Sequence, residues 1–93
     1  MLSGTTDFVS LIRMAVAGRM GIDESYVVLG ETQVRIEEKR AVKEVLIDGE
    51  KTGVFYDMSV PVDENNKPDV TKIVDAENRK IDDIVSELTL KGY

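Results

Sequence analysis

The chain of 93 residues contains no histidine, no cysteine and no tryptophan. Without cysteine there is no disulfide framework and no thiolate metal site, and without histidine the usual proton shuttle at neutral pH is missing. The serine, threonine, tyrosine, lysine and carboxylate residues that remain form no G-x-S-x-G or S-x-x-K motif and no phosphate-binding glycine loop. We therefore expect a protein that is not an enzyme and that carries no cofactor.

Long hydrophobic runs are also missing. The most apolar segment, residues 8 to 20, is interrupted by Arg13 and Arg19 and falls short of the roughly 20 residues that cross a bilayer. No basic region precedes it, as a secretory signal would require. Together with the lack of cysteine, these features predict a cytoplasmic protein that does not associate with membranes.

Negative charge dominates the chain, most strongly in its second half. Residues 1 to 47 carry seven acidic and six basic side chains, whereas residues 48 to 93 carry eleven acidic and six basic ones, giving net charges of −1 and −5. Nucleic-acid affinity depends on lysine and arginine contacts to phosphates, so direct nucleic-acid binding is not expected. A basic protein is a more suitable partner.

The composition, 42% hydrophobic and 32% charged, is that of a folded globular protein. We predict a single α+β domain over residues 1–93 that begins with a helix over residues 5 to 20, capped by Thr5 or Thr6 and ended by Gly21. Five of its residues share one helical face: Phe8, Leu11, Ile12, Ala15 and Val16. Three more widen that face (Val9, Met14 and Met20), so this helix is predicted to be buried on more than one side, by a sheet or by a second copy of the chain.

The middle of the chain predicts three or four short antiparallel strands. Residues 22 to 29 are predicted to form a short turn that leads into a strand, and Gly30 interrupts the pattern. Residues 32 to 37 alternate as a half-buried strand, with the apolar Val34 and Ile36 on one side. Residues 37 to 47 suit a strand or a helix. A hairpin near residues 48–53, containing Asp48-Gly49, then leads into a strand over residues 53 to 62.

A C-terminal helix is predicted over residues 69 to 90, followed by Gly92, because apolar residues recur there at intervals of three and four. The alternative is a strand over residues 70 to 74 followed by a shorter helix. Both helices are expected to pack on one face of the sheet.

Two sets of polar residues are candidates for chemistry. Asp63, Asn65 and Asp69 alternate as in a calcium loop, although the glycine and glutamate of an EF-hand are replaced by Pro68 and Val74. A solvated connector is the simpler interpretation, and calcium or magnesium binding is the alternative. Glu77 lies near the centre of the apolar stripe of the C-terminal helix, either as a buried functional carboxylate or as the ion-pair partner of Lys80.

The first function hypothesis is a small acidic protein-protein interaction or assembly domain, with self-association as a homodimer left open. Its proposed contact residues are those at the margins of the wide face of the first helix: Val9, Arg13, Met14 and Met20. The second hypothesis is an acidic inhibitor or nucleic-acid mimic that occupies a basic groove on a nucleic-acid-binding protein. A divalent-cation binding protein is the third.

Overall fold

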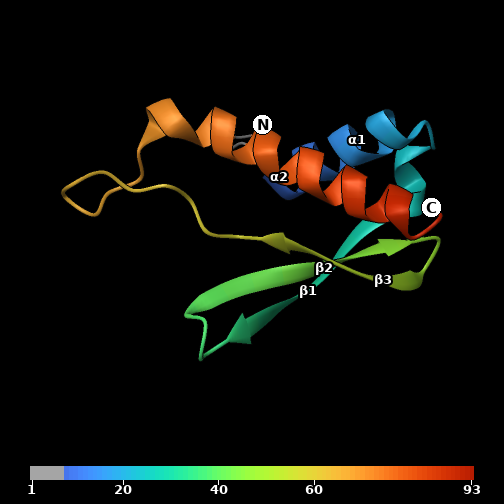
Figure 1. Ribbon diagram of the computed structural model, residues 1–93, viewed down its shortest axis with the longest axis horizontal. Helices are drawn as coiled ribbons and strands as arrows, with labels where there is room; N and C mark the ends of the chain where they lie inside the picture. Colours follow the sequence, from blue (N-terminus) through green and yellow to red (C-terminus); the bar gives the residue numbers. More distant parts are fainter. Residues whose placement is uncertain (1–7) are drawn as a thin grey trace, which may run out of the picture.

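The computed structural model describes residues 8–93, which form an α+β domain (Figure 1). The element order is α1 (Phe8–Met20), a 3-10 turn η1 (Glu24–Tyr26), β1 (Val27–Arg35), β2 (Arg40–Ile47), β3 (Glu50–Asp57) and α2 (Val70–Leu90). The predicted fold class is confirmed. The segment over residues 37 to 47, for which strand and helix were both open, forms β2, and residues 70 to 74 are helical. The proposed caps Thr5 and Thr6 lie outside the described residues.

The three strands form an antiparallel sheet in the order β1-β2-β3. The predicted hairpin joins β2 to β3 through Asp48 and Gly49, whose φ angles of 52° and 78° are both positive, as a two-residue hairpin turn of type I′ requires. The strand predicted to reach residue 62 ends at Asp57, and a fourth strand does not form in residues 8–93. Residues 58 to 69 instead make a long connection to α2, held by one isolated bridge between Val62 and Pro68.

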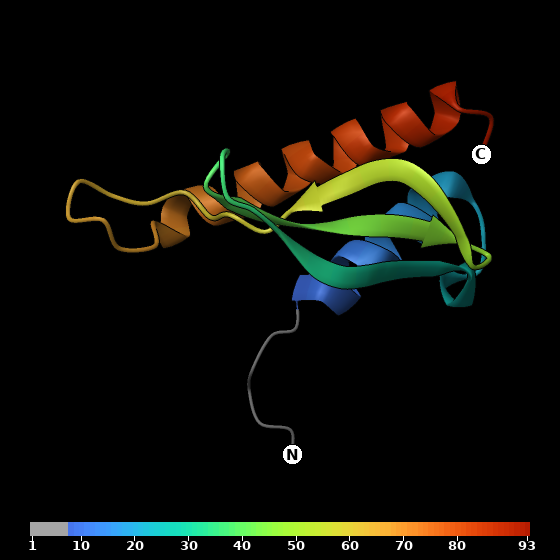
Figure 2. The same cartoon turned by 90° about the horizontal axis from the view of Figure 1, so that it is seen from below.

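Both helices pack on the sheet side by side (Figure 2). α1 contacts β1, α2 contacts β3, and the two helices contact each other. Their shared core is built from eleven buried residues: Ile12, Val16, Ala17, Val27, Leu29, Val45, Val54, Tyr56, Ile81, Ile84 and Leu88. Within residues 8–93, neither helix combines the length and apolarity needed to cross a membrane.

The ends of both helices follow signals present in the sequence. α1 is terminated by Gly21, which follows its last residue and has a φ of +72°. The N–H of Gly21 donates to the carbonyl of Gly18, and the N–H of Ile22 donates to the carbonyl of Ala17. α2 begins where the Asp69 carboxylate accepts the N–H of Thr71 at 3.1 Å. It ends before Gly92, whose N–H binds the carbonyl of Thr89.

The β1–β2 hairpin projects away from the helices (Figure 1). Gly30 does not end the strand as the sequence pattern suggested. Between the pairs Leu29–Val45 and Thr32–Lys43, Gly30 and Glu31 face one residue of β2, which is a β-bulge. A bulge bends a strand and increases its twist. The residues beyond it leave the cover of the helices, and the expected burial of Val34 and Ile36 is wrong, since they are 72% and 83% exposed.

Candidate functional site

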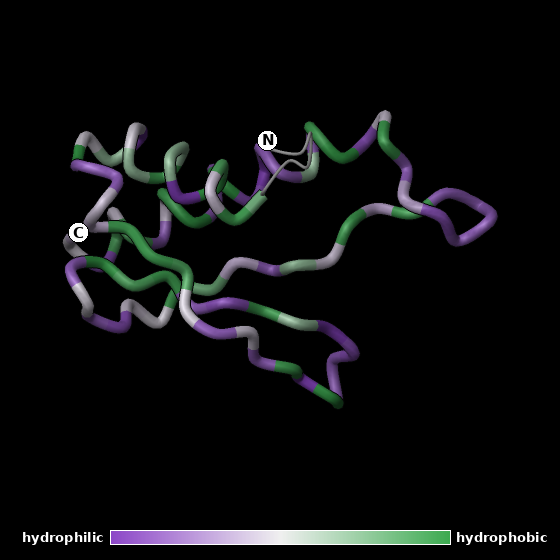
Figure 3. The backbone as a smooth tube through the Cα atoms, turned by 180° about the vertical axis from the view of Figure 1, so that it is seen from behind, coloured by the Kyte–Doolittle hydropathy of each residue, from purple (hydrophilic) through white to green (hydrophobic). Residues whose placement is uncertain are grey.

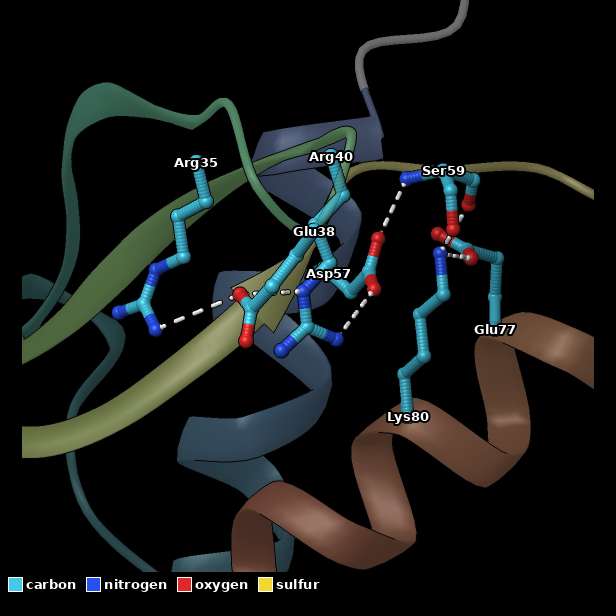
Figure 4. Close-up of polar contacts among 7 residues, drawn as sticks. All are labelled: Arg35, Glu38, Arg40, Asp57, Ser59, Glu77 and Lys80. Atoms are coloured by element: carbon cyan, nitrogen blue, oxygen red, sulfur yellow. Dashed lines mark hydrogen bonds and ion pairs between the residues drawn. The ribbon is translucent and has the colours of Figure 1, made fainter.

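A buried polar network joins β3 to α2, and Figure 4 shows the part of it formed by Glu77, Lys80 and Ser59. The hydroxyl of Tyr56 donates to Glu77 Oε1 at 2.5 Å, and Lys80 Nζ lies 2.7 Å from Glu77 Oε2. Their side chains are largely covered, at 10% exposure for Glu77 and 17% for Lys80. The predicted ion pair of Glu77 with Lys80 is confirmed, and the carboxylate is buried, whereas a functional role for Glu77 stays a prediction.

The same network anchors the connection that follows β3. Lys80 Nζ donates to the carbonyl of Ser59 at 2.5 Å and lies 5.0 Å from the centre of the Tyr56 ring. Burial, and then the hydrogen bond to Glu77, raise the pKa of Tyr56 far above its usual value, so the phenol stays protonated. The group therefore acts as a hydrogen-bond donor that holds helix to strand.

A shallow cleft of about 340 Å³ lies beside this network. Arg40 projects into it and donates to Asp57 at 3.2 Å and to Glu38 at 3.2 Å. Burial opposes ionisation of Asp57, but hydrogen bonds from Ser59 and Arg40 and the charge of Lys80 outweigh it, so the pKa of Asp57 is lowered. Because Arg40 and Lys80 are both matched by carboxylates, this cleft is suited to holding the fold together rather than to binding an anion.

In the candidate cation loop, the carboxylate oxygens of Asp63 and Asp69 accept hydrogen bonds from nearby backbone N–H groups. Asp63 Oδ1 accepts the N–H groups of Asn65 and Lys67 at 2.8 and 3.0 Å, and the Asp69 carboxylate caps α2. Over residues 8–93, no three acidic side chains gather in a group that could hold a metal ion. The loop therefore has the contacts of the solvated connector, and cation binding by Asp63, Asn65 and Asp69 stays a prediction.

An apolar hollow of about 290 Å³ lies between the N-terminal halves of α1 and α2. We call it the helix groove, and nine residues line it: Phe8, Leu11, Ile12, Ala15, Ile73, Val74, Glu77, Asn78 and Ile81. Phe8, Leu11 and Val74 are 41%, 49% and 66% exposed. A second hollow, which shares Ala15, Asn78 and Ile81 with the first, extends the groove past Met14 toward the ion pair of Arg19 and Asp82.

The four proposed contact residues have different surroundings. Met14 is 52% exposed at the edge of the groove. Val9 and Met20 are partly buried against the core. Arg13 donates from Nε to the carbonyl of Val27 at 2.6 Å and from Nη2 to that of Glu24 at 3.2 Å. Only Met14 of the four borders the groove, and Arg13 instead ties α1 to the start of the sheet.

Several residues that the sequence assigned to the interior are exposed. Phe8 and Leu11 were placed on the buried face of the first helix, and Val70 and Val74 on that of the second. Their periodicity was correct, but Phe8, Leu11 and Val74 line the helix groove between α1 and α2 and do not enter the core beneath it. Helical periodicity offers no signal for this difference, because a residue at the groove and a residue in the core share the same spacing and only the way in which the two helices meet separates them.

The tube coloured by hydropathy shows hydrophobic segments at the tip of the β1–β2 hairpin and at the start of α2, both away from the core (Figure 3). The helix groove, the tip of the β1–β2 hairpin and the start of α2 are therefore the candidate functional surfaces. A fold alone does not select a function. No protein-family model matches this chain, and no match was found among curated proteins or solved structures.

Proposed function

We propose that the protein is a small acidic, non-catalytic interaction or assembly domain, and that the helix groove is its principal contact surface. The observation that carries this proposal is the exposure of Phe8, Leu11 and Val74 around the helix groove, and of Met14 at the second hollow that extends it. Continuous apolar surface of this kind is typical of sites that bind other proteins. The absence of cysteine and histidine from the sequence also supports a non-catalytic role, and we place the protein in the cytoplasm.

The chemistry of the groove favours a protein partner over a small ligand. Its volume of about 290 Å³ is at the lower limit of ligand pockets, which start near 300 Å³. Eight of its nine lining residues carry no charge, and the ninth, Glu77, is paired with Lys80. A few apolar side chains from a docking protein fit such a surface, and a charged or polar metabolite does not.

The acidic inhibitor or nucleic-acid mimic is less well supported. A mimic needs carboxylates that are free to meet a basic groove. In the acidic half of the chain, Asp57, Asp69, Glu77 and Asp82 each lie in an ion pair with a lysine or arginine of the same chain. These four carboxylates are therefore not free to meet a basic groove.

The test compares the solution mass of the wild type with that of Leu11→Glu by light scattering, at two protein concentrations and in low and high salt. Leu11 lines the groove and is half exposed, so a glutamate there is compatible with folding. We expect the wild type to exceed the monomer mass and Leu11→Glu to lower it. Two results together would contradict the proposal. The wild type would stay monomeric, and a protein that binds the wild type would bind Leu11→Glu equally well.

A further inference from the structure

We propose that copies of this chain associate head to tail, with Val34 and Ile36 at the tip of the β1–β2 hairpin of one copy seated in the helix groove of the next. This inference rests on the proposed function, because it names the occupant of the same groove. The two surfaces lie on different parts of the molecule (Figure 1). The contact is therefore heterologous, and it closes into a dimer or ring or continues as a filament according to the rotation between copies.

The hairpin has the shape of an inserting element. Arg35 and Arg40 form the last pair of the ladder, and the four residues between them make the turn. Ile36, the first of these, is 83% exposed, and Val34 precedes the turn at 72% exposure. Isolated exposed apolar residues are ordinary, but Val34 and Ile36 form an aliphatic pair near the end of a projecting hairpin, beside the charged turn residues Glu37, Glu38 and Lys39. The tip leaves the core at the β1 bulge, so it reaches a neighbour without disturbing the domain.

The groove matches this tip in size and polarity. Its volume of about 290 Å³ corresponds to about ten water molecules at about 30 Å³ each, a space suited to one or two aliphatic side chains. Leu11 and Val74 line it from opposite helices. Water in so apolar a hollow finds few hydrogen-bonding partners, and its release favours insertion of an apolar side chain.

The hairpin and α2, taken as whole elements, carry net charges of opposite sign. Residues 32 to 43 carry four basic and two acidic side chains, a net charge of +2, on a chain whose net charge is −6. α2 carries three basic and five acidic side chains, a net charge of −2. Part of the hairpin's charge is already paired within the chain, since Glu38 pairs with Arg35 and Arg40, and Arg40 also pairs with Asp57. Lys39 is exposed next to Glu37 and Glu38 in the turn, and Asp75 is exposed next to Val74 in the sequence. Contact of hairpin with helix therefore brings opposite charges together, whereas contact of α2 with α2 brings like charges together.

The experiment uses two variants that each damage one surface. Ile36→Glu damages the tip and keeps the groove, and Leu11→Glu damages the groove and keeps the tip. Leu90→Glu is the matched control, because Leu90 is 87% exposed at the far end of α2 and the substitution adds the same charge. Circular dichroism checks that each variant folds, and Val74→Glu replaces Leu11→Glu if that variant unfolds. The solution mass of each protein, and of an equimolar mixture of the two damaged variants, is then measured by light scattering.

We expect Ile36→Glu and Leu11→Glu each to weaken association at least about tenfold, and Leu90→Glu to behave as the wild type. The mixture is expected to recover a one-to-one complex, because it contains one intact tip and one intact groove that fit each other. Assembly of Ile36→Glu like the wild type, with loss only in Leu11→Glu, would overturn head-to-tail docking and leave the proposed function standing. A monomeric wild type, or a mixture that stays monomeric, would also overturn the inference.

Discussion

At the scale of single residues, the contact between Tyr56 and Glu77 is a polar interaction within the core. The Tyr56 side chain is 4% exposed, and its hydroxyl donates to a buried carboxylate. Tyr56→Phe keeps the ring and removes the donor, so we expect the free energy of unfolding to fall by about 1–2 kcal/mol. Urea denaturation measures this loss. Tyr26→Phe is the control, because Tyr26 is 49% exposed, and its effect is expected to stay within about 0.5 kcal/mol.

The raised pKa of Tyr56 predicts a loss of stability in alkali. Burial, with the hydrogen bond to Glu77, holds the phenol protonated in the folded state, whereas in the unfolded chain it ionises near pH 10.0. Below that pH both states are protonated and the stabilisation is complete. Above it the unfolded state loses a proton that the folded state keeps, so stability falls by up to about 1.4 kcal/mol per pH unit.

Lysine side chains also titrate in this range, so the comparison that isolates Tyr56 is with Tyr56→Phe. We expect the stability of the variant to decline less steeply between pH 10 and 11 than that of the wild type, by the contribution of one proton. Parallel curves for the two proteins in urea denaturation would show that Tyr56 ionises as readily in the folded state as in the unfolded chain.

At the scale of elements, the two arginines of α1 allow a direct comparison of contact types. Arg13 donates to two backbone carbonyls in η1 and β1, whereas Arg19 makes an ion pair with Asp82 between side chains that are 50% and 61% exposed. We expect Arg13→Ala to lower the free energy of unfolding by about 1–3 kcal/mol, because the acceptors of a charged donor are left unpaired. Arg19→Ala is expected to change it by less than about 1 kcal/mol. Equal losses in thermal or urea denaturation would contradict the connecting role of Arg13.

Replacing either of two glycines near the end of α1 with alanine is expected to change stability in opposite directions. An added Cβ at Gly18 or at Gly21 meets no atom within 4 Å, so packing does not distinguish them. Gly18 is helical, and Gly18→Ala is expected to raise stability by about 0.5–1 kcal/mol. Gly21 has a φ of +72°, and Gly21→Ala is expected to lower stability by about 1–2 kcal/mol. Melting temperatures that shift in the same direction would show that the backbone angle is not the deciding factor.

The elements themselves were largely predictable from the sequence, and their exposure was not. Asp48-Gly49 and Gly21 are local signals, so the hairpin and the end of α1 appear where the sequence placed them. Burial of Val34 and Ile36 depends on whether a helix reaches that part of the sheet, and the bulge at Gly30 and Glu31 turns the strand away. The helix groove requires residues more than sixty positions apart, such as Leu11 and Val74, to meet. Periodicity identified both apolar faces but not the solvent-exposed gap between them.

At the scale of the whole molecule, a small buried core is combined with two apolar surfaces that stay exposed. Eleven buried residues join the sheet and the two helices, while the hairpin tip and the helix groove stay open to solvent. Association would bury both surfaces and would therefore add to the stability of the folded state. The folding stability of the chain is then linked to its own concentration.

That linkage gives a prediction for the intact protein. If the folded state associates and the unfolded state does not, a tenfold increase in concentration adds up to about 1.4 kcal/mol per contact formed, and the melting temperature rises. We expect the rise in the wild type and in Leu90→Glu, and a melting temperature independent of concentration in Ile36→Glu and in Leu11→Glu. Scanning calorimetry over a range of concentrations measures it. Because the tip and the groove each remain intact in one of the two damaged variants, their mixture should regain the concentration dependence that neither shows alone, a result that a general loss of stability in the variants could not produce.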